Sequence, residues 1–182
     1  MKYFYFFSIL LIVFITACDS NNSGKSSRDG KIDKTVTIGG QTWMAENLNY
    51  GTYLEDLGNG TGGSSQYQSG AQKFCYDNNE LSCDTLGGLY QWHTVMNFAK
   101  ECGDGNQACD SQIKPGNHQG ICPTGWHVPK ALELDLLGAE LGGLSIAGEK
   151  MKTSNLGGNN SSSFSALGTG LRHFQGDFFN KD

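Results

Sequence analysis

The sequence predicts an α+β domain with short antiparallel strands, two helices and long loops rich in Gly, Ser and Asn. Two β-rich runs flank a Gly-Gly pair near the start of the domain, and apolar residues recur at helical spacing in two later segments. The chain also contains 26 glycines, about twice ordinary usage, which indicates many turns. These observations favour a loop-rich domain rather than a helical bundle.

The first eighteen residues have the order of a bacterial lipoprotein signal. Lys2 precedes an apolar run over residues 3–14, interrupted only by Ser8, and small residues at 16–17 stand directly before Cys18. The run is too short for a transmembrane helix, which needs roughly 20 residues. We therefore expect removal of residues 1–17 and attachment of diacylglycerol to Cys18, whose partner would be membrane lipid. An uncleaved anchor, or an ordinary signal with an incidental cysteine, is the alternative.

The next segment, residues 18–28, contains the run DSNNSGKSSR and has almost nothing apolar to bury, so we expect a flexible tether. Residues 29–182 have a length suited to a single domain. The formal net charge is −5, which argues against nucleic acid as a partner because binding to phosphates needs a basic face. The expected location is the bacterial cell envelope, with the outer membrane or cell surface favoured over the inner membrane.

The domain should open with a β-hairpin. A two-residue turn at Gly39-Gly40 would oppose Ile38 to Gln41 and Val36 to Trp43. This register places Val36, Ile38 and Trp43 on one face, which we expect to be buried. The segment over residues 51–70 is rich in Gly, Ser and Thr and predicts a surface loop.

The first helix is expected from about Tyr90 to Lys100. Apolar residues at 89, 92, 96 and 99 follow helical spacing and predict one stripe, more consistent with a core face than with a ligand platform.

The second helix is expected over residues 129–141, because Pro129 suits its start and Gly142-Gly143 its end. Leucines would lie on two opposite sides, with Leu134, Leu137 and Leu141 on one side and Leu132, Leu136 and Ala139 on the other. This arrangement predicts burial between two layers. A Gly/Asn/Ser loop over 155–163 and a strand-like segment over 165–174 should follow.

Five cysteines remain after Cys18, an odd number. Export permits disulfides, and the short spacings favour a Cys75–Cys83 pair and a Cys102–Cys109 pair, with Cys122 left over. Zinc is the competing interpretation. It is disfavoured because no two cysteines have the two-residue spacing of a zinc knuckle.

Binding rather than catalysis is the better interpretation of the remaining polar residues. Tyr53, Tyr67 and Tyr76 lie in polar loops, where their rings would stack on sugars, although loop tyrosines are common. Calcium is a possible cofactor because residues 77–80 and 103–110 carry oxygen ligands, but neither segment has the alternating pattern of a calcium loop. We expect no other metal or cofactor.

No catalytic constellation is evident. Glycines at 58, 60 and 63 fit a G-x-G-x-x-G pattern without the preceding strand and following helix that dinucleotide binding requires. Cys122 and His127 lie five residues apart, but no group to orient the base is visible. His127 is instead expected to be a buried, hydrogen-bonded residue beside Trp126.

Several motifs taken in order resemble the Fibrobacter succinogenes major paralogous domain. They are WMAENLNY at 43–50, FCYDNNELSC at 74–83 with GGLYQW at 87–92, CPTGWHVP at 122–129 and FSALGTGLR at 164–172. The resemblance runs from about residue 28 to residue 179. It implies an exported, often lipid-anchored module with a C-type-lectin-like fold and no established activity.

Three departures from the family pattern affect these expectations. Leu134 stands where the family usually has tryptophan, and Lys130 stands where a serine often caps the helix. The family domain also continues to a closing strand with a cysteine, which we expect to be the natural partner of Cys122. The resemblance thus implies a C-terminal end that is incomplete.

Taken together, the sequence predicts an envelope-anchored lipoprotein whose domain binds surface glycans, polysaccharide or protein, or has a structural role. We do not expect an enzyme. The alternative is an exported enzyme distantly related to formylglycine-generating oxidases, which carry a G-W-x-x-P-like segment, although we see neither paired active-site cysteines nor copper ligands.

Overall fold

The computed structural model describes residues 34–54, 70–104, 107–173 and 176–181. These residues form two compact units, each assembled from separated parts of the chain. Unit 1 contains the described residues of 47–115 and 168–182, and unit 2 contains those of 10–46 and 116–167. The expected boundaries of the signal and the tether lie outside the described residues, so they stay predictions.

The described residues contain short strands and four α-helices, which confirms the α+β class. The expectation of two helices was too low, because α1 and α4 each span only two turns and were not predicted. In chain order the elements are β1 (Thr35–Ile38), β2 (Gln41–Met44), β3 (Thr52–Tyr53), β4 (Gln72–Lys73), α1 (Glu80–Leu86), α2 (Trp92–Val95), α3 (Ala131–Glu140), α4 (Leu144–Met151), β5 (Leu171–Arg172) and β6 (Phe178–Phe179). Short 3-10 helices cover Tyr76–Asn78 (η1), Lys100–Asp104 (η2), Gln107–Gln112 (η3) and Ser154–Leu156 (η4).

Unit 2 begins with the predicted hairpin, and its register is as expected. β1 and β2 pair antiparallel, with Val36 opposite Trp43 and Ile38 opposite Gln41. Gly39 and Gly40 both have positive φ, as a two-residue turn with the right-handed strand twist requires. A Cβ at Gly39 would also lie 2.1 Å from Cγ of Glu140, so a side chain at this position would push the Glu140 side chain aside.

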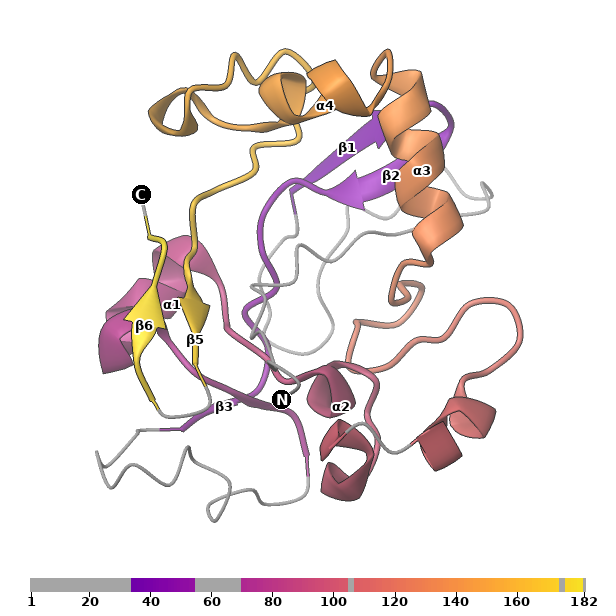
Figure 1. The fold of residues 1–182 in the computed structure, drawn as a ribbon, viewed down its shortest axis with the longest axis vertical. Helices are drawn as coiled ribbons and strands as arrows, with labels where there is room; N and C mark the ends of the chain where they lie inside the picture. Colours follow the sequence, from indigo (N-terminus) through magenta and orange to yellow (C-terminus); the bar gives the residue numbers. More distant parts are fainter. Residues whose placement is uncertain (1–33, 55–69, 105–106, 174–175, 182) are drawn as a thin grey trace. The chain divides into compact units, whose positions relative to one another are not determined.

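The core of unit 2 joins this hairpin to the two helices α3 and α4, which Figure 1 shows near the β1–β2 pair. Trp43 is fully buried, and its ring centroid lies 5.9 Å from that of Phe164. Trp43 and Ile38 are buried on this face as predicted, whereas Val36 is only partly buried and packs against the same cluster. The buried cluster consists of Ile38, Trp43, Leu137, Leu141, Ala147 and Phe164.

Helix α3 lies within the predicted bounds, but it is not buried between two layers. Leu137 and Leu141 are buried, whereas Leu134, on the same predicted side, is 43% exposed. The opposite side, with Leu132, Leu136 and Ala139, is exposed. Within the described residues of unit 2, one face of the helix packs against the hairpin and α4, and the residues on its other side are exposed. The symmetric spacing of the leucines therefore misled the prediction.

Glu133 and His127 stabilise the start of α3. The Glu133 carboxylate accepts a hydrogen bond from the backbone N–H of Lys130 at 2.8 Å and lies 3.2 Å from Nε2 of His127. The Lys130 side chain makes no capping hydrogen bond, as the departure from serine predicted. The Glu133 bond to the Lys130 N–H is the reciprocal half of a capping box, and it satisfies a different backbone donor from the one that a serine side chain would reach. His127 is buried and hydrogen-bonded, which confirms the prediction for this residue.

Unit 1 contains two short strand pairs and both predicted disulfides. β3 and β4 pair parallel, and β5 and β6 pair antiparallel. The Cys75–Cys83 and Cys102–Cys109 bonds confirm the predicted local pairing, and Cys122, in unit 2, is buried and belongs to neither bond. A small core forms around Phe74 and Leu89, against which Leu54 and Phe178 pack.

Candidate functional site

The structure brings two of the three predicted stacking tyrosines together. The Tyr53 hydroxyl, on β3, donates a hydrogen bond to the Asn78 carbonyl oxygen at 2.7 Å. Because Asn78 ends the 3-10 helix that Tyr76 begins, this bond joins the two segments. Tyr53 and Tyr76 are each partly buried. Tyr67 lies outside the described residues, so its placement stays a prediction.

The Tyr76 ring contacts β6 and residues next to β5 and β6. Its centroid lies 5.2 Å from that of Phe178, and the Lys181 ammonium lies 5.2 Å from the ring centroid. Gly170 permits the close approach, because a Cβ there would lie 2.3 Å from Cε2 of Tyr76. Tyr76 is therefore a packed side chain with an exposed part rather than an open platform.

A buried arginine stacks on two phenylalanine rings next to Tyr76. Arg172 is fully buried, and its guanidinium lies 4.1 Å from the Phe74 ring centroid and 5.9 Å from that of Phe178. Stacking of this kind combines packing with attraction between the cation and the ring face. Because side chains alternate along a strand, Phe178 points toward the core and Phe179 points outward, where it is 47% exposed.

Trp92 is an exposed aromatic residue that the sequence pattern did not predict to be exposed. The expected helix over 90–100 is only one turn long, since α2 ends at Val95 and Asn97 has a positive φ of 56°. The predicted core stripe is therefore wrong in half of its members: Leu89 and Met96 are buried, whereas Trp92 is 44% exposed and Ala99 is exposed. A sharp break after one turn removes the periodicity on which the stripe depended.

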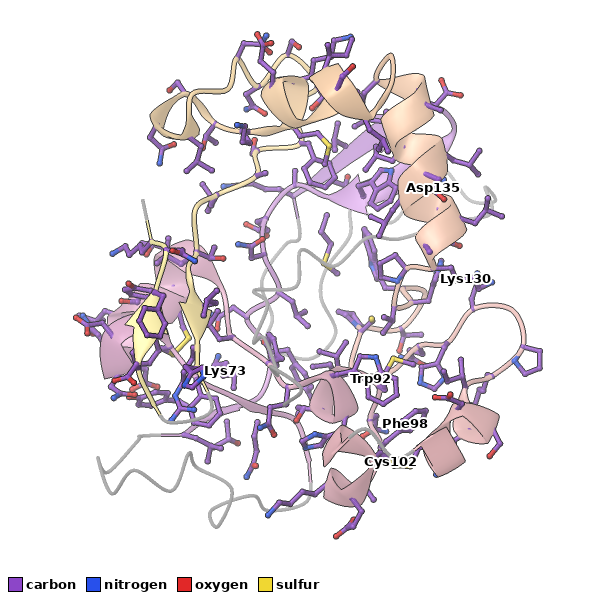
Figure 2. The ribbon with its side chains drawn as sticks, viewed as in Figure 1. Lys73, Trp92, Phe98, Cys102, Lys130 and Asp135 are labelled. Atoms are coloured by element: carbon purple, nitrogen blue, oxygen red, sulfur yellow. A yellow bond between two sulfur atoms is a disulfide. The ribbon has the colours of Figure 1, made fainter. Side chains whose placement is uncertain are left out.

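The Trp92 ring is held in place by an aromatic neighbour. Figure 2 shows Trp92 and Phe98 beside α2, and their centroids lie 5.7 Å apart with the rings inclined at 69°. Edge contacts of this kind are favourable between aromatic rings. We call Trp92 and Phe98 the α2 aromatic pair.

The structure describes all of the first segment considered for calcium, residues 77–80, and part of the second, residues 103–110. In residues 77–80, Asn79 caps α1 by accepting a hydrogen bond from the Leu81 N–H at 3.1 Å, so that side chain stabilises the helix start. Residues 103–110 are only partly described. Within the described ranges, no group of three His, Cys, Asp or Glu side chains is placed to hold a metal ion.

The proposed lipid site and signal lie outside the described residues. Among the helices that the structure does describe, none is both long and apolar enough to cross a membrane.

Comparison with protein families gives a clear result. The model of the Fibrobacter succinogenes major domain matches residues 36–182, nearly the whole chain. The chain therefore belongs to this family, as the motifs at 43–50 and 122–129 predicted. No curated protein and no solved structure matches the chain.

Proposed function

We propose that the protein is a bacterial envelope lipoprotein anchored through Cys18. The cationic start, the short apolar run and the small residues before Cys18 support this proposal. A tether over residues 18–28 would hold the family domain away from the lipid surface, at the outer membrane or on the cell surface.

Metabolic labelling with a fatty-acid analogue tests the anchor. The wild-type chain should take up label and Cys18→Ala should not, whereas Cys122→Ala, which removes another cysteine outside the two disulfides, should label like the wild type. Equal labelling of Cys18→Ala and wild type would exclude this site of lipidation.

We further propose that the domain binds glycans through exposed aromatic residues of unit 1. The single observation that carries this proposal is the α2 aromatic pair, in which Phe98 packs against the half-exposed ring of Trp92. Rigid aromatic rings with an exposed face suit sugar stacking, because the apolar side of a pyranose covers the ring while its hydroxyls stay hydrated. The exposed Asn97 amide, five residues along the chain, would supply polar contact.

Tyr53 and Tyr76 form a second group of aromatic candidates. The exposed part of each ring and the Lys181 ammonium beside Tyr76 support a role in ligand contact. A C-type-lectin-like arrangement, which the family resemblance implied, is part of the same proposal. We propose no catalytic step and no obligatory cofactor.

A glycan and polysaccharide screen on the folded chain, with and without calcium, tests this proposal. Saturable binding that Trp92→Ala abolishes would support it. Leu81→Ala is the matched control, since Leu81 is an exposed apolar residue of the same unit. Equal binding by Trp92→Ala and wild type would reject the α2 aromatic pair, and product release from a glycan or peptide would favour the enzyme alternative.

A protein ligand is the second candidate, and exposed leucines of unit 2 favour it. Leu132 on α3 is 65% exposed and Leu144 on α4 is 77% exposed, and exposed leucines can contribute apolar surface to a protein contact. This candidate predicts loss of partner capture in Leu132→Ser or Leu144→Ser without loss of glycan binding.

A further inference from the structure

Three side chains of unit 1 form a chain of contacts that the binding proposal does not use. The Lys73 ammonium nitrogen, Nζ, lies 2.5 Å from Oδ1 of Asn49 and 3.3 Å from the Asn49 backbone oxygen. On the other side of the same amide, Nδ2 of Asn49 lies 3.5 Å from Oδ1 of Asp84. An amine, a carboxamide and a carboxylate are thus aligned in this order.

We propose that Lys73 and Asn49 form an intramolecular isopeptide bond, with Asp84 as the proton-transfer group. The distance between Nζ and Oδ1 is shorter than the usual range of about 2.7 to 3.2 Å for an N–H···O hydrogen bond. Because the carbonyl carbon is directly bonded to Oδ1, the amine is close to the separation of about 3 to 3.5 Å from which reacting atoms can combine.

The Asn49 side chain is presented by a fixed stretch of backbone. Tyr90, which is buried, accepts a hydrogen bond from the Tyr50 N–H at 2.8 Å and donates to the Tyr50 carbonyl at 2.8 Å. The same hydroxyl lies 3.2 Å from the Leu48 carbonyl. Tyr90 therefore holds the residues on both sides of Asn49, and little freedom must be lost to reach the reactive geometry.

Lys73 is also constrained. It lies on β4 opposite Tyr53, and its carbonyl accepts a hydrogen bond from the Leu54 N–H at 2.9 Å. The side chain is only 9% exposed, so little water competes with the Asn49 amide for the amine. Figure 2 labels Lys73, whose nitrogen is held inside unit 1 rather than extended into solvent as is usual for lysine.

The third group comes from α1. Asp84 follows Cys83, whose disulfide with Cys75 fixes the helix to the segment directly after β4. This bond keeps the carboxylate on the leaving-group side of the Asn49 amide. Asp84 is exposed, so it can also exchange protons with water during the reaction.

The reaction balances without an oxidant or another reactant. The Lys73 ammonium first loses one proton to solvent. The resulting neutral amine then attacks Cγ of Asn49, and a new C–N bond forms. Asp84 accepts the proton that the amine gives up and delivers a proton to Nδ2. The bond between Cγ and Nδ2 then breaks, and ammonia leaves. The product is a secondary amide that joins residues 24 positions apart in the sequence.

Such a bond would act as a third covalent link in an exported domain that already has two disulfides. Like a disulfide, it would lower the conformational entropy of the unfolded chain and so stabilise the fold. Unlike a disulfide, it would persist under reducing conditions.

Peptide mapping by mass spectrometry of the full chain, purified under reducing conditions, tests the proposal. We expect a branched peptide that contains both Lys73 and Asn49, with a mass lower than the sum of its two parts by one ammonia and no tryptic cleavage after Lys73. A cyclic imide at Asn49 would also lose ammonia, but it would leave the two peptides separate. Two separate peptides, each with its sequence mass, or an imide only, would overturn the proposal.

Matched variants test the role of each group. Lys73→Arg and Asn49→Ala should abolish the branched peptide, while Lys114→Arg, at an exposed lysine of the same unit, should retain it. Asp84→Asn should reduce cross-linking at least tenfold at equal times, and Asp110→Asn, which removes another exposed carboxylate, should not.

Circular dichroism should show that Asp84→Asn is folded. Wild-type cross-linking in this folded variant would overturn the proposed mechanism. If Asp84→Asn fails to fold, Asp84→Glu is the variant to test, because it keeps the carboxylate and should retain the isopeptide bond. A folded Asp84→Glu variant without the cross-link would count against Asp84 as the proton-transfer group. The wild-type map by itself decides whether the bond exists.

Discussion

Replacing Trp43 with alanine should be among the most destabilising single changes in unit 2. Trp43 has no exposed surface and packs against Phe164 within the cluster that joins the hairpin to α3 and α4. A buried tryptophan removes about 150 to 250 Å² from water. At about 25 cal/mol per Å², this area corresponds to about 4 to 6 kcal/mol, and measured core substitutions of this kind cost about 3 to 5 kcal/mol. Since domains are stable by only about 5 to 15 kcal/mol, Trp43→Ala should leave unit 2 close to unfolding.

The indole nitrogen makes a second variant informative. Nε1 of Trp43 is buried and has no hydrogen-bond partner in the described part of the chain. Phenylalanine would keep most of the packing and lose no hydrogen bond, so Trp43→Phe should cost about 1 to 2 kcal/mol, well below the alanine variant.

Urea unfolding followed by far-UV circular dichroism measures both changes. Trp92→Ala is the matched control, since the same residue type is removed from a half-exposed position, and it should change the free energy of unfolding by less than about 1 kcal/mol. If Trp43→Ala unfolds within 1 kcal/mol of the wild type, the proposed core of unit 2 is wrong.

Three further predictions concern local interactions. Glu133 accepts a hydrogen bond at the start of α3 and contacts His127, so Glu133→Ala should lower the free energy of unfolding in urea by about 2 to 4 kcal/mol. Glu133→Gln should lower it clearly less. Equal losses in the two variants would show that the hydrogen bonds contribute little. Gly170→Ala should lower the melting temperature, because φ is +69° and the added Cβ would meet Tyr76 and lie 2.7 Å from the Phe179 backbone oxygen. An unchanged melting temperature would refute this close approach. A thiol reagent should modify Cys122, which is fully buried, much faster in denaturant than in the native protein, and equal rates would contradict its burial.

The hairpin register, the two disulfides and the ends of α3 were predicted correctly, because each depends on residues that are near one another in the sequence. The Gly39-Gly40 turn fixes which residues face each other across the hairpin, so the turn and the alternation of side chains placed Val36, Ile38 and Trp43 on one face. The two disulfides join cysteines that are eight and seven positions apart, and such short separations need no knowledge of distant contacts. The start and end of α3 were indicated by Pro129 and Gly142-Gly143.

The predictions that failed depended on what packs against an element. The leucines of α3 have the spacing of a helix buried on two sides, yet among the described residues the core covers one side of it, and Leu132 and Leu136 are exposed. The stripe through Trp92 assumed a continuous helix, and the break after Val95 turns this tryptophan outward. Neither outcome can be calculated from hydrophobic periodicity, because periodicity specifies a face and not its partner.

The sequence by itself determined the α+β class, the family, the hairpin register and the two disulfides, because each depends on local geometry or on a contiguous motif. Only the tertiary structure decided which aromatic rings are exposed, and it alone placed Lys73 beside Asn49 and Asp84. These three residues are brought together by β4, by the Tyr90 hydroxyl and by the Cys75–Cys83 bond. A site of this kind depends on distances of a few ångströms between separate segments, which arise only when side-chain packing fixes those segments against each other.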